Sequence, residues 1–158
     1  MAENVQITLK SKENKQFKIS EKAANRAKVI KDILIDYEKG EDIPLEIDSD
    51  TLEIIIKYLE HYSNEEPKNI QKPLKTGDLS KVLEPWDFEF ISKISLDKAI
   101  DLVNGTNYLD IPSLLQLSLC RIGSEMLDKP IEEVQKKFEI ECDMTEEEKK
   151  EYDKYPLD

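Results

Sequence analysis

The sequence has few of the residues on which catalytic, metal-binding and disulfide chemistry most often depends. Its 158 residues include one histidine, two cysteines and four glycines. Two isolated cysteines, Cys120 and Cys142, exclude a disulfide framework and a cysteine-based zinc site, and they favour a reducing compartment, the cytoplasm or the nucleus. The scarcity of glycine favours a helix-rich domain over a turn-rich β-sandwich.

Long apolar runs and a positive charge balance are also missing. No segment approaches the length of a transmembrane helix, and the opening MAENVQITLKSKENK has no apolar centre of a signal peptide. Thirty-five acidic residues outnumber 23 basic ones, which gives a formal net charge of −12. Because phosphate contacts need clustered lysine and arginine, this balance disfavours nucleic acid and anionic membranes as partners. It favours partner proteins with basic faces.

Motifs for catalysis and cofactor binding are absent. The chain has no GxGxxG, GxxxxGK[ST], HExxH or CxxC pattern. The single histidine, His61, stands near the end of an expected helix without a second histidine or a cysteine nearby, so we expect a solvated helix-end residue. The glutamate runs at 65–66 and 146–148 lack calcium-loop spacing and are expected to be solvated faces. The sequence therefore predicts no catalytic residue, no metal ligand and no cofactor.

The apolar residues that are present predict a small sheet in the first third of the chain. Apolar and polar residues alternate from Val5 to Leu9 and again at Phe17 and Ile19, which is typical of a β-hairpin. The segment IPLEI, residues 43–47, has the pattern of a third short strand. With 39% hydrophobic residues, the chain can bury one core that carries a helical appendage.

Helices are expected around and after these strands. Ser20 has the features of an N-cap for a helix that ends at Gly40, and a second helix begins near Ser49. The polar, proline-containing segment 64–84 is expected to be a mobile loop. From Pro85 to the end the pattern is helical only. The predicted fold class is therefore α+β, with a helical extension.

The helix that follows Ile111 is apolar well beyond one face. Two interpretations stay open at this point. It is a core helix enclosed by its own chain, or it leaves an apolar face for a partner. The apolar positions are Ile111, Leu114, Leu115, Leu117, Leu119, Ile122, Met126 and Leu127.

Five segments in a fixed order resemble one known family. They are TLEIIIKYLEHYSNEEP, PWDFEF, NYLDIPSLL, IEEVQKKFEI and TEEE, and the resemblance as a whole covers nearly the whole chain, from Val5 to about Lys150. Their order and spacing resemble the S-phase kinase-associated family, the adaptors of SCF-type ubiquitin ligases. The resemblance implies a BTB/POZ-like domain over residues 1–127, with a small three-stranded sheet, and a helical extension over 128–158 that completes an F-box-binding surface.

The resemblance also implies the partners and their sites. A non-catalytic adaptor of this kind links a cullin scaffold to F-box substrate receptors, and an isolated copy would self-associate weakly. The cullin-binding residues implied are Asn107, Tyr108, Ile33 and Leu34. The F-box-binding residues implied are Ile100, Val103, Leu119, Ile122, Val134 and Phe138. Trp86 is expected to anchor internal packing.

Three features depart from the family pattern, and two other functions stay open. The chain ends YDKYPLD without the family's terminal tryptophan, the acidic insert is reduced to KGEDI, and Ile131 occupies the place of a hydroxylatable proline. One alternative is an elongin-C-like adaptor, although such chains stop where the helix after Ile111 ends. The other is a homo-oligomeric BTB module without a role in ubiquitin transfer.

Overall fold

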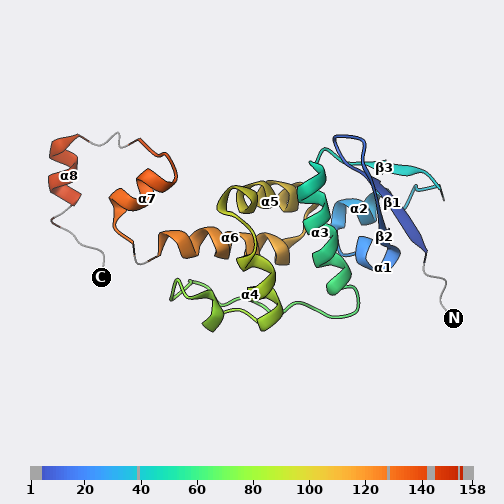
Figure 1. Cartoon of the computed structure of the whole chain (residues 1–158), viewed down its shortest axis with the longest axis horizontal. Coiled ribbons are helices and arrows are strands. Elements are labelled where there is room, and N and C mark those ends of the chain that lie inside the picture. Colours follow the sequence, from blue (N-terminus) through green and yellow to red (C-terminus); the bar gives the residue numbers. More distant parts are fainter. Residues whose placement is uncertain (1–4, 39, 128, 142–144, 153, 155–158) are drawn as a thin grey trace.

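The computed structural model describes residues 5–38, 40–127, 129–141, 145–152 and 154. In Figure 1 the sheet and the first three helices form one end of an elongated molecule, and the last two helices form the other. The elements, in chain order, are β1 (Gln6–Lys10), β2 (Gln16–Ser20), α1 (Glu21–Ala24), α2 (Lys28–Ile33), β3 (Asp42–Pro44), α3 (Ser49–His61), η1 (Leu79–Lys81), α4 (Pro85–Ser92), α5 (Leu96–Leu109), α6 (Pro112–Met126), α7 (Ile131–Lys137) and α8 (Glu146–Tyr152). The α+β fold class is confirmed.

The sheet has the strand order β2-β1-β3, with β1 in the centre. β1 and β2 form the expected antiparallel hairpin, with Leu9 opposite Phe17, and β3 pairs with β1 in parallel. The third strand begins one residue earlier than predicted and is shorter. Nevertheless Ile43, Leu45 and Ile47 are all buried and alternate with exposed residues, so the period-two pattern identified the correct face.

The single helix predicted from Ser20 to Gly40 is wrong, because the chain forms two short helices there. Ser20 does cap α1, accepting a hydrogen bond from the Ala23 backbone N–H. The chain then leaves the helical conformation at Ala27 and re-enters it as α2. The break has a packing reason: α1 lies on the sheet and α3, whereas α2 packs on α5. One straight helix would not reach both neighbours.

Helices α3 and α5 pack closely through a glycine. A methyl group on Gly105 would lie 3.1 Å from Ile55 Cδ1 and 3.2 Å from Thr51 Cγ2. Asp48 caps α3, Ser95 caps α5, and prolines open α4 and α6. The resulting core centres on α3, α5 and the inner face of α6.

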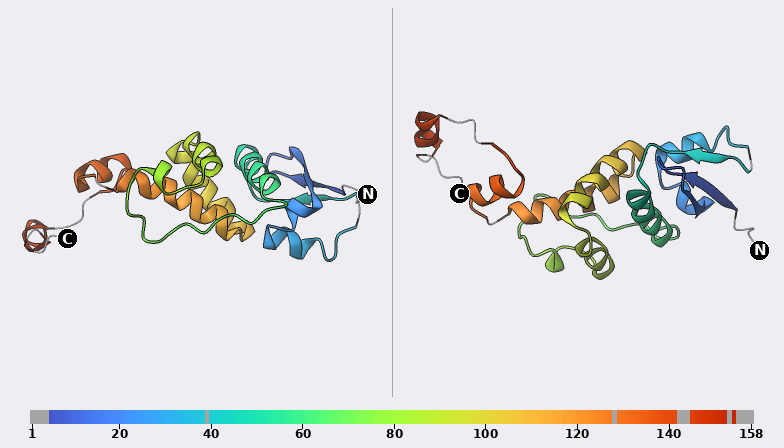
Figure 2. Two further views of the ribbon diagram at one scale, coloured as in Figure 1. Left: turned by 90° about the horizontal axis from the view of Figure 1, so that it is seen from below. Right: turned by 45° about the horizontal axis from the view of Figure 1, so that its top comes forward.

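The segment predicted as a mobile loop has no regular structure except η1. Figure 2 shows it passing along one side of the body between α3 and α4. Its later part is anchored, since Leu79 and Leu83 are buried and Leu74 packs against the core. Its mobility stays a prediction.

The last two helices lie beyond the end of α6 in every view (Figures 1 and 2). Thr145 caps α8 in a capping box, in which its hydroxyl accepts from the Glu148 backbone and the Glu148 carboxylate accepts from the Thr145 backbone. Residues 128, 142–144, 153 and 155–158 of the expected helical extension lie outside the described residues. No helix among those described is long and apolar enough to cross a membrane.

Candidate interaction surfaces

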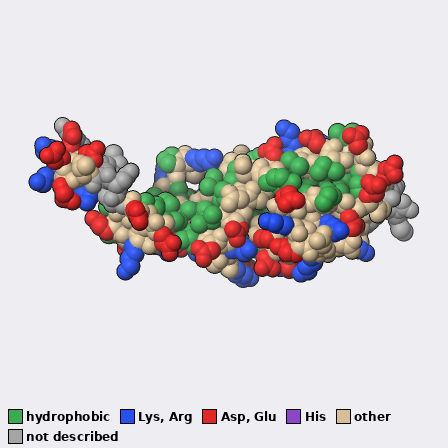
Figure 3. Space-filling view, turned by 90° about the horizontal axis from the view of Figure 1, so that it is seen from above, with side chains coloured by type: hydrophobic (Ala, Val, Ile, Leu, Met, Phe, Trp, Pro, Cys, Tyr) green, Lys and Arg blue, Asp and Glu red, His purple; other side chains and the backbone are tan. Residues whose placement is uncertain are grey.

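Large apolar side chains are exposed in two separate regions of the molecule. Figure 3 shows hydrophobic side chains gathered at the sheet-bearing end and again toward the C-terminal helices. Single exposed apolar residues are common on protein surfaces, whereas a group of them on adjoining helices marks an interaction site. The exposed set comprises Ile33, Ile35, Ile100, Tyr108, Leu119, Met126, Ile131 and Ile140.

The first region, here called the α2–α5 surface, consists of Ile33, Ile35, Asn107 and Tyr108. Asn107 and Tyr108 are exposed on the last turn of α5, and Ile33 is exposed at the end of α2. The two helices pack together and are joined by an ion pair between Lys28 and Asp110, with Nζ and Oδ2 3.6 Å apart.

The fourth residue of the implied cullin site, Leu34, differs from the other three. Its side chain is half-buried and packs against the core, so it supports the surface from beneath. Ile35 takes its place as the exposed apolar residue, with 78% of its area accessible. Ile35 does not belong to the apolar helical stripe that contains Ile30 and Leu34. Its position in the sequence could therefore have predicted its exposure.

Acidic side chains surround the α2–α5 surface. Asp36, Glu41 and Asp42 line a hollow of about 370 Å³ together with Ile33. Asp48 and Asp101 line another beside Tyr108. An apolar centre with a negative rim fits a partner that presents apolar residues among basic ones.

The second region, here called the α5–α6–α7 surface, consists of the six residues implied for F-box binding together with Met126 and Ile131. Ile100 and Leu119 are exposed to 41% and 49%. Val103, Ile122, Val134 and Phe138 are half-buried. These side chains come from three consecutive helices, of which α5 and α6 pack together, whereas α7 is joined to α6 by an ion pair between Lys137 and Glu125.

Helix α6 combines both interpretations that its apolar pattern left open. Leu114 and Leu117 are buried against the helices beneath, as a core helix requires. Leu119 and Met126 lie on the opposite side and are exposed. A helix with one covered apolar face and one uncovered apolar face retains surface for a partner.

Glu125 joins α7 to α6. Its carboxylate accepts hydrogen bonds from Arg121 at 2.5 Å, from Lys129 at 3.1 Å and from Lys137 of α7. These three cations, Lys137 first, lower the pKa of Glu125 to about 2. No residue of α7 is fully buried, so this ion cluster is a major part of what positions Val134 and Phe138.

Replacing Glu125 by glutamine is expected to loosen α7 in a pH-dependent way. The pKa is lower in the folded chain, so the carboxylate stabilises that state above pH 4.5, and the contribution disappears as the pH falls toward 2. At pH 7, Glu125→Gln should lower the free energy of unfolding by about 1 kcal/mol, allowing for solvent screening.

Urea unfolding and hydrogen exchange of the α7 amides, at neutral and acid pH, test this. Glu53→Gln is the control, because Glu53 makes only an exposed ion pair with Lys57. Equal stability of the Glu125 variant and the unchanged protein at pH 7 would contradict the proposed anchoring.

An aromatic cluster fixes the position of α4 against α3. Tyr62 Oη donates a 2.8 Å hydrogen bond to the buried carboxylate of Asp87. Burial raises the pKa of Asp87, and burial together with the Asp87 carboxylate raises the pKa of Tyr62. Trp86 packs against the core, as the sequence predicts.

His61 is exposed at the end of α3, as expected, but it is not free of contacts. Its ring stacks on Trp86 with the centroids 3.6 Å apart and the planes within 2°. This places His61 in a packing role that sequence reasoning missed, because the two residues are 25 positions apart. Among the residues that the structure describes, no cluster of histidine, cysteine, aspartate and glutamate is arranged to hold a metal ion.

The fold and its two open apolar surfaces define an interaction module of the BTB/POZ kind with a helical extension. Residues 5–64 match the Skp1 family tetramerisation domain, and residues 112–154 match the Skp1 family dimerisation domain. The chain belongs to the Skp1 family, the S-phase kinase-associated proteins that its motifs resemble.

Individual members of the family are similar to this chain along most of its length. The sequence is 33% identical over 146 residues to the S-phase kinase-associated protein 1 homolog of Tetrahymena thermophila, covering 92% of this chain and 88% of the relative. It is 34% identical over 143 residues to SKP1-like protein 10 of Arabidopsis thaliana, with 90% and 88% covered. It is 28% identical over 144 residues to the E3 ubiquitin ligase complex SCF subunit sconC of Arthroderma benhamiae, with 90% and 87% covered.

Proposed function

We propose that this chain is a non-catalytic adaptor of an SCF-type ubiquitin ligase that links a cullin to F-box proteins. The observation that carries the proposal is the uncovered outer face of α6, with Leu119 and Met126 exposed, in a chain that belongs to the Skp1 family. The α5–α6–α7 surface would receive the F-box. The α2–α5 surface, with its acidic rim, would receive the cullin.

Helix α5 would set the distance between the two partners. It carries Ile100 of one surface and Tyr108 of the other, and eight residues of α-helix rise about 12 Å. Because α5 is packed between α3 and α6, this separation is fixed by the core. A fixed separation holds the substrate receptor at a constant place relative to the cullin, which makes transfer of ubiquitin effectively intramolecular. The chain itself would contribute no reacting group.

The alternatives have less support. An elongin-C-like adaptor would stop where α6 ends, whereas the match to the Skp1 dimerisation domain continues through α7 and α8 to residue 154. A homo-oligomeric module would cover its own apolar surfaces. Weak self-association in the absence of an F-box is compatible with the adaptor proposal. The proposal includes a location in the cytoplasm and nucleus, where two isolated cysteines stay reduced.

Co-expression tests the adaptor function directly. The chain, an F-box fragment and the N-terminal region of a cullin should co-elute as one complex with equal amounts of each, measured by size-exclusion chromatography with light scattering. A stable homodimer that the F-box fragment does not change would instead support the homo-oligomeric module. If a panel of F-box proteins from the same organism never co-purifies, the proposed main partner is wrong.

A further inference from the structure

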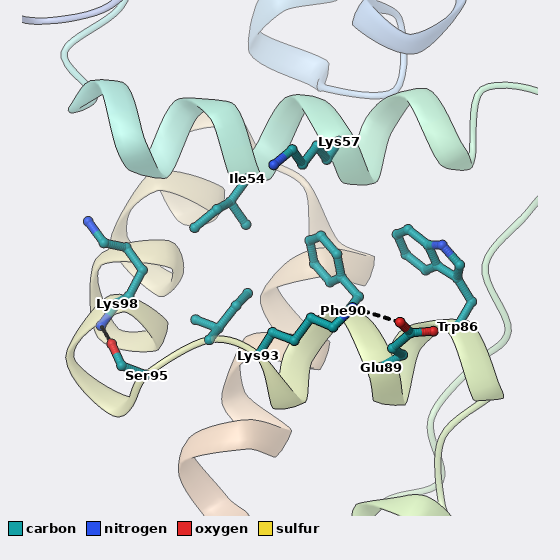
Figure 4. A pocket seen from close by; sticks show the side chains of 9 residues that line it. Ile54, Lys57, Trp86, Glu89, Phe90, Lys93, Ser95 and Lys98 are labelled. Carbon is teal, nitrogen blue, oxygen red and sulfur yellow. Dashed lines mark hydrogen bonds and ion pairs between the residues drawn. The ribbon is translucent and has the colours of Figure 1, made fainter.

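A third hollow lies between α3, α4 and the beginning of α5, apart from both surfaces assigned above. Its volume is about 600 Å³, and Figure 4 shows the side chains that line it. Ile54, Phe90 and Ile94 form its apolar floor, and Trp86 closes one end. None of these four residues belongs to the α2–α5 surface or to the α5–α6–α7 surface.

Lysines outnumber carboxylates among the residues that line this groove, although each of these lysines also pairs with a neighbouring carboxylate. Lys57 of α3, Lys93 after α4 and Lys98 of α5 line it, against a single acidic residue, Glu89. The whole chain has 35 acidic and 23 basic residues. We call this hollow the lysine-rimmed groove.

Two of the rim lysines, Lys57 and Lys93, are held by short-range ion pairs on the surface. Lys57 lies 3.2 Å from Glu53, and Lys93 lies 2.6 Å from Glu89, in each case one turn away on the same helix. Exposed pairs of this kind contribute little stability, so an incoming carboxylate competes with them at small cost. Lys98 is more enclosed, and it pairs with Asp48 and Asp101.

From the charge and shape of this groove we infer that it binds a short acidic segment of a partner protein, anchored by an aliphatic or aromatic side chain. The apolar floor accepts the anchor, and a volume of about 600 Å³ is typical of a site for a small ligand or a few side chains. The lysines come from three elements and stand around the groove. That distribution suits several carboxylates along a peptide better than one carboxylate on a small molecule.

Charge also favours an acidic occupant over other peptides. Most of the surface repels an acidic segment, because the net charge is −12. At the lysine-rimmed groove, apolar contact coincides with three ammonium groups that such a segment can pair with in place of their present carboxylate partners. A basic segment would find the floor equally apolar and the rim repulsive.

The single tryptophan makes the groove directly observable. Trp86 is the only tryptophan in the chain and lines the groove, so its fluorescence reports occupancy of this site. The probe is a synthetic peptide of about ten residues, with one leucine and one phenylalanine among glutamates and aspartates and no tryptophan. Titration into the full chain should shift the Trp86 emission in a saturable manner.

Charge reversal at the rim should remove this binding. The double variant Lys57→Glu/Lys93→Glu is expected to bind the peptide at least about tenfold more weakly. Lys57→Gln/Lys93→Gln, which adds no repulsion next to Glu53, should show a smaller loss in the same direction. Lys12→Glu/Lys18→Glu reverses the same number of charges at two exposed positions outside the groove, so it is the matched control and should bind as the unchanged chain does. Thermal unfolding of each variant checks that the fold is retained.

Five results would overturn the proposal. The first four are no saturable shift up to about 1 mM peptide, equal binding of a peptide with lysine in place of the acidic residues, equal loss in the Lys12/Lys18 control, and phenylacetate binding as tightly as the peptide. The segment TEEEKKEYDKYPLD, residues 145–158, is tested as a separate peptide. If it binds more tightly than the probe, the occupant is a second copy of this chain and the partner-protein proposal is wrong. None of these results depends on capture of a cullin or an F-box.

Discussion

A chain in which Ile100 and Leu119 are both replaced by aspartate is expected to lose F-box capture almost completely. Both side chains are largely exposed, at 41% and 49%, so the substitutions leave the core intact. In the complex they would place two carboxylates in an apolar contact without partners, and each unpaired buried charge costs several kcal/mol. The affinity for an F-box fragment, measured by calorimetry or by co-purification, should fall at least about 100-fold.

The control for this variant is Ile35→Asp. Ile35 is the most exposed of the large apolar residues, at 78%, and belongs to the α2–α5 surface. The substitution introduces one carboxylate, half the charge of the double variant, on an equally apolar residue outside the α5–α6–α7 surface, so F-box capture should be unchanged. Undiminished capture by the Ile100/Leu119 variant would show that the F-box binds elsewhere. Equal loss in the Ile35 variant would show that added negative charge alone explains the effect.

The order of elements could be predicted from the sequence because local signals define it. Ser95 caps α5, Pro85 and Pro112 open α4 and α6, and alternation identifies the hairpin. These signals act within a few residues, where backbone hydrogen bonding decides the outcome. These local signals therefore do not depend on how the rest of the chain packs.

The sequence predictions are wrong or incomplete where contacts between residues distant in the sequence determine the structure. Ala27 breaks the expected first helix because α2 packs on α5, whose residues are about seventy positions later. The stacking of His61 on Trp86, 25 positions later, was missed for the same reason. Neither outcome has a local signal, because each follows from which elements become neighbours.

The candidate sites divide in the same manner. Asn107 and Tyr108 form one short motif, and the structure shows both exposed. The lysine-rimmed groove, by contrast, combines Lys57, Lys93 and Lys98 from three elements. In the sequence, the apolar residues of its floor cannot be distinguished from ordinary core residues. Only the fold brings the lysines around it.

The double variant Asn107→Ala/Tyr108→Ala is expected to lose cullin capture and to keep F-box binding. Tyr108 is 46% exposed on the last turn of α5, with an amide neighbour and an acidic rim around it. An exposed tyrosine at the centre of an interface commonly carries 2 kcal/mol or more of binding energy, which corresponds to a loss of about 30-fold or more. The measurement is the affinity of the chain, bound to an F-box fragment, for the N-terminal region of a cullin.

Tyr108→Phe and the Ile100→Asp/Leu119→Asp variant together make this result interpretable. The phenylalanine variant keeps the ring, so partial retention of cullin capture would assign the main effect to apolar contact rather than to the hydroxyl. The aspartate variant should show the reverse selectivity, losing the F-box and keeping the cullin. Ile100 and Tyr108 lie on the same helix, so only two separate surfaces produce opposite losses from substitutions within α5 and its neighbour. If the Asn107/Tyr108 variant loses both partners equally, these residues support the fold, and α5 does not separate two binding surfaces.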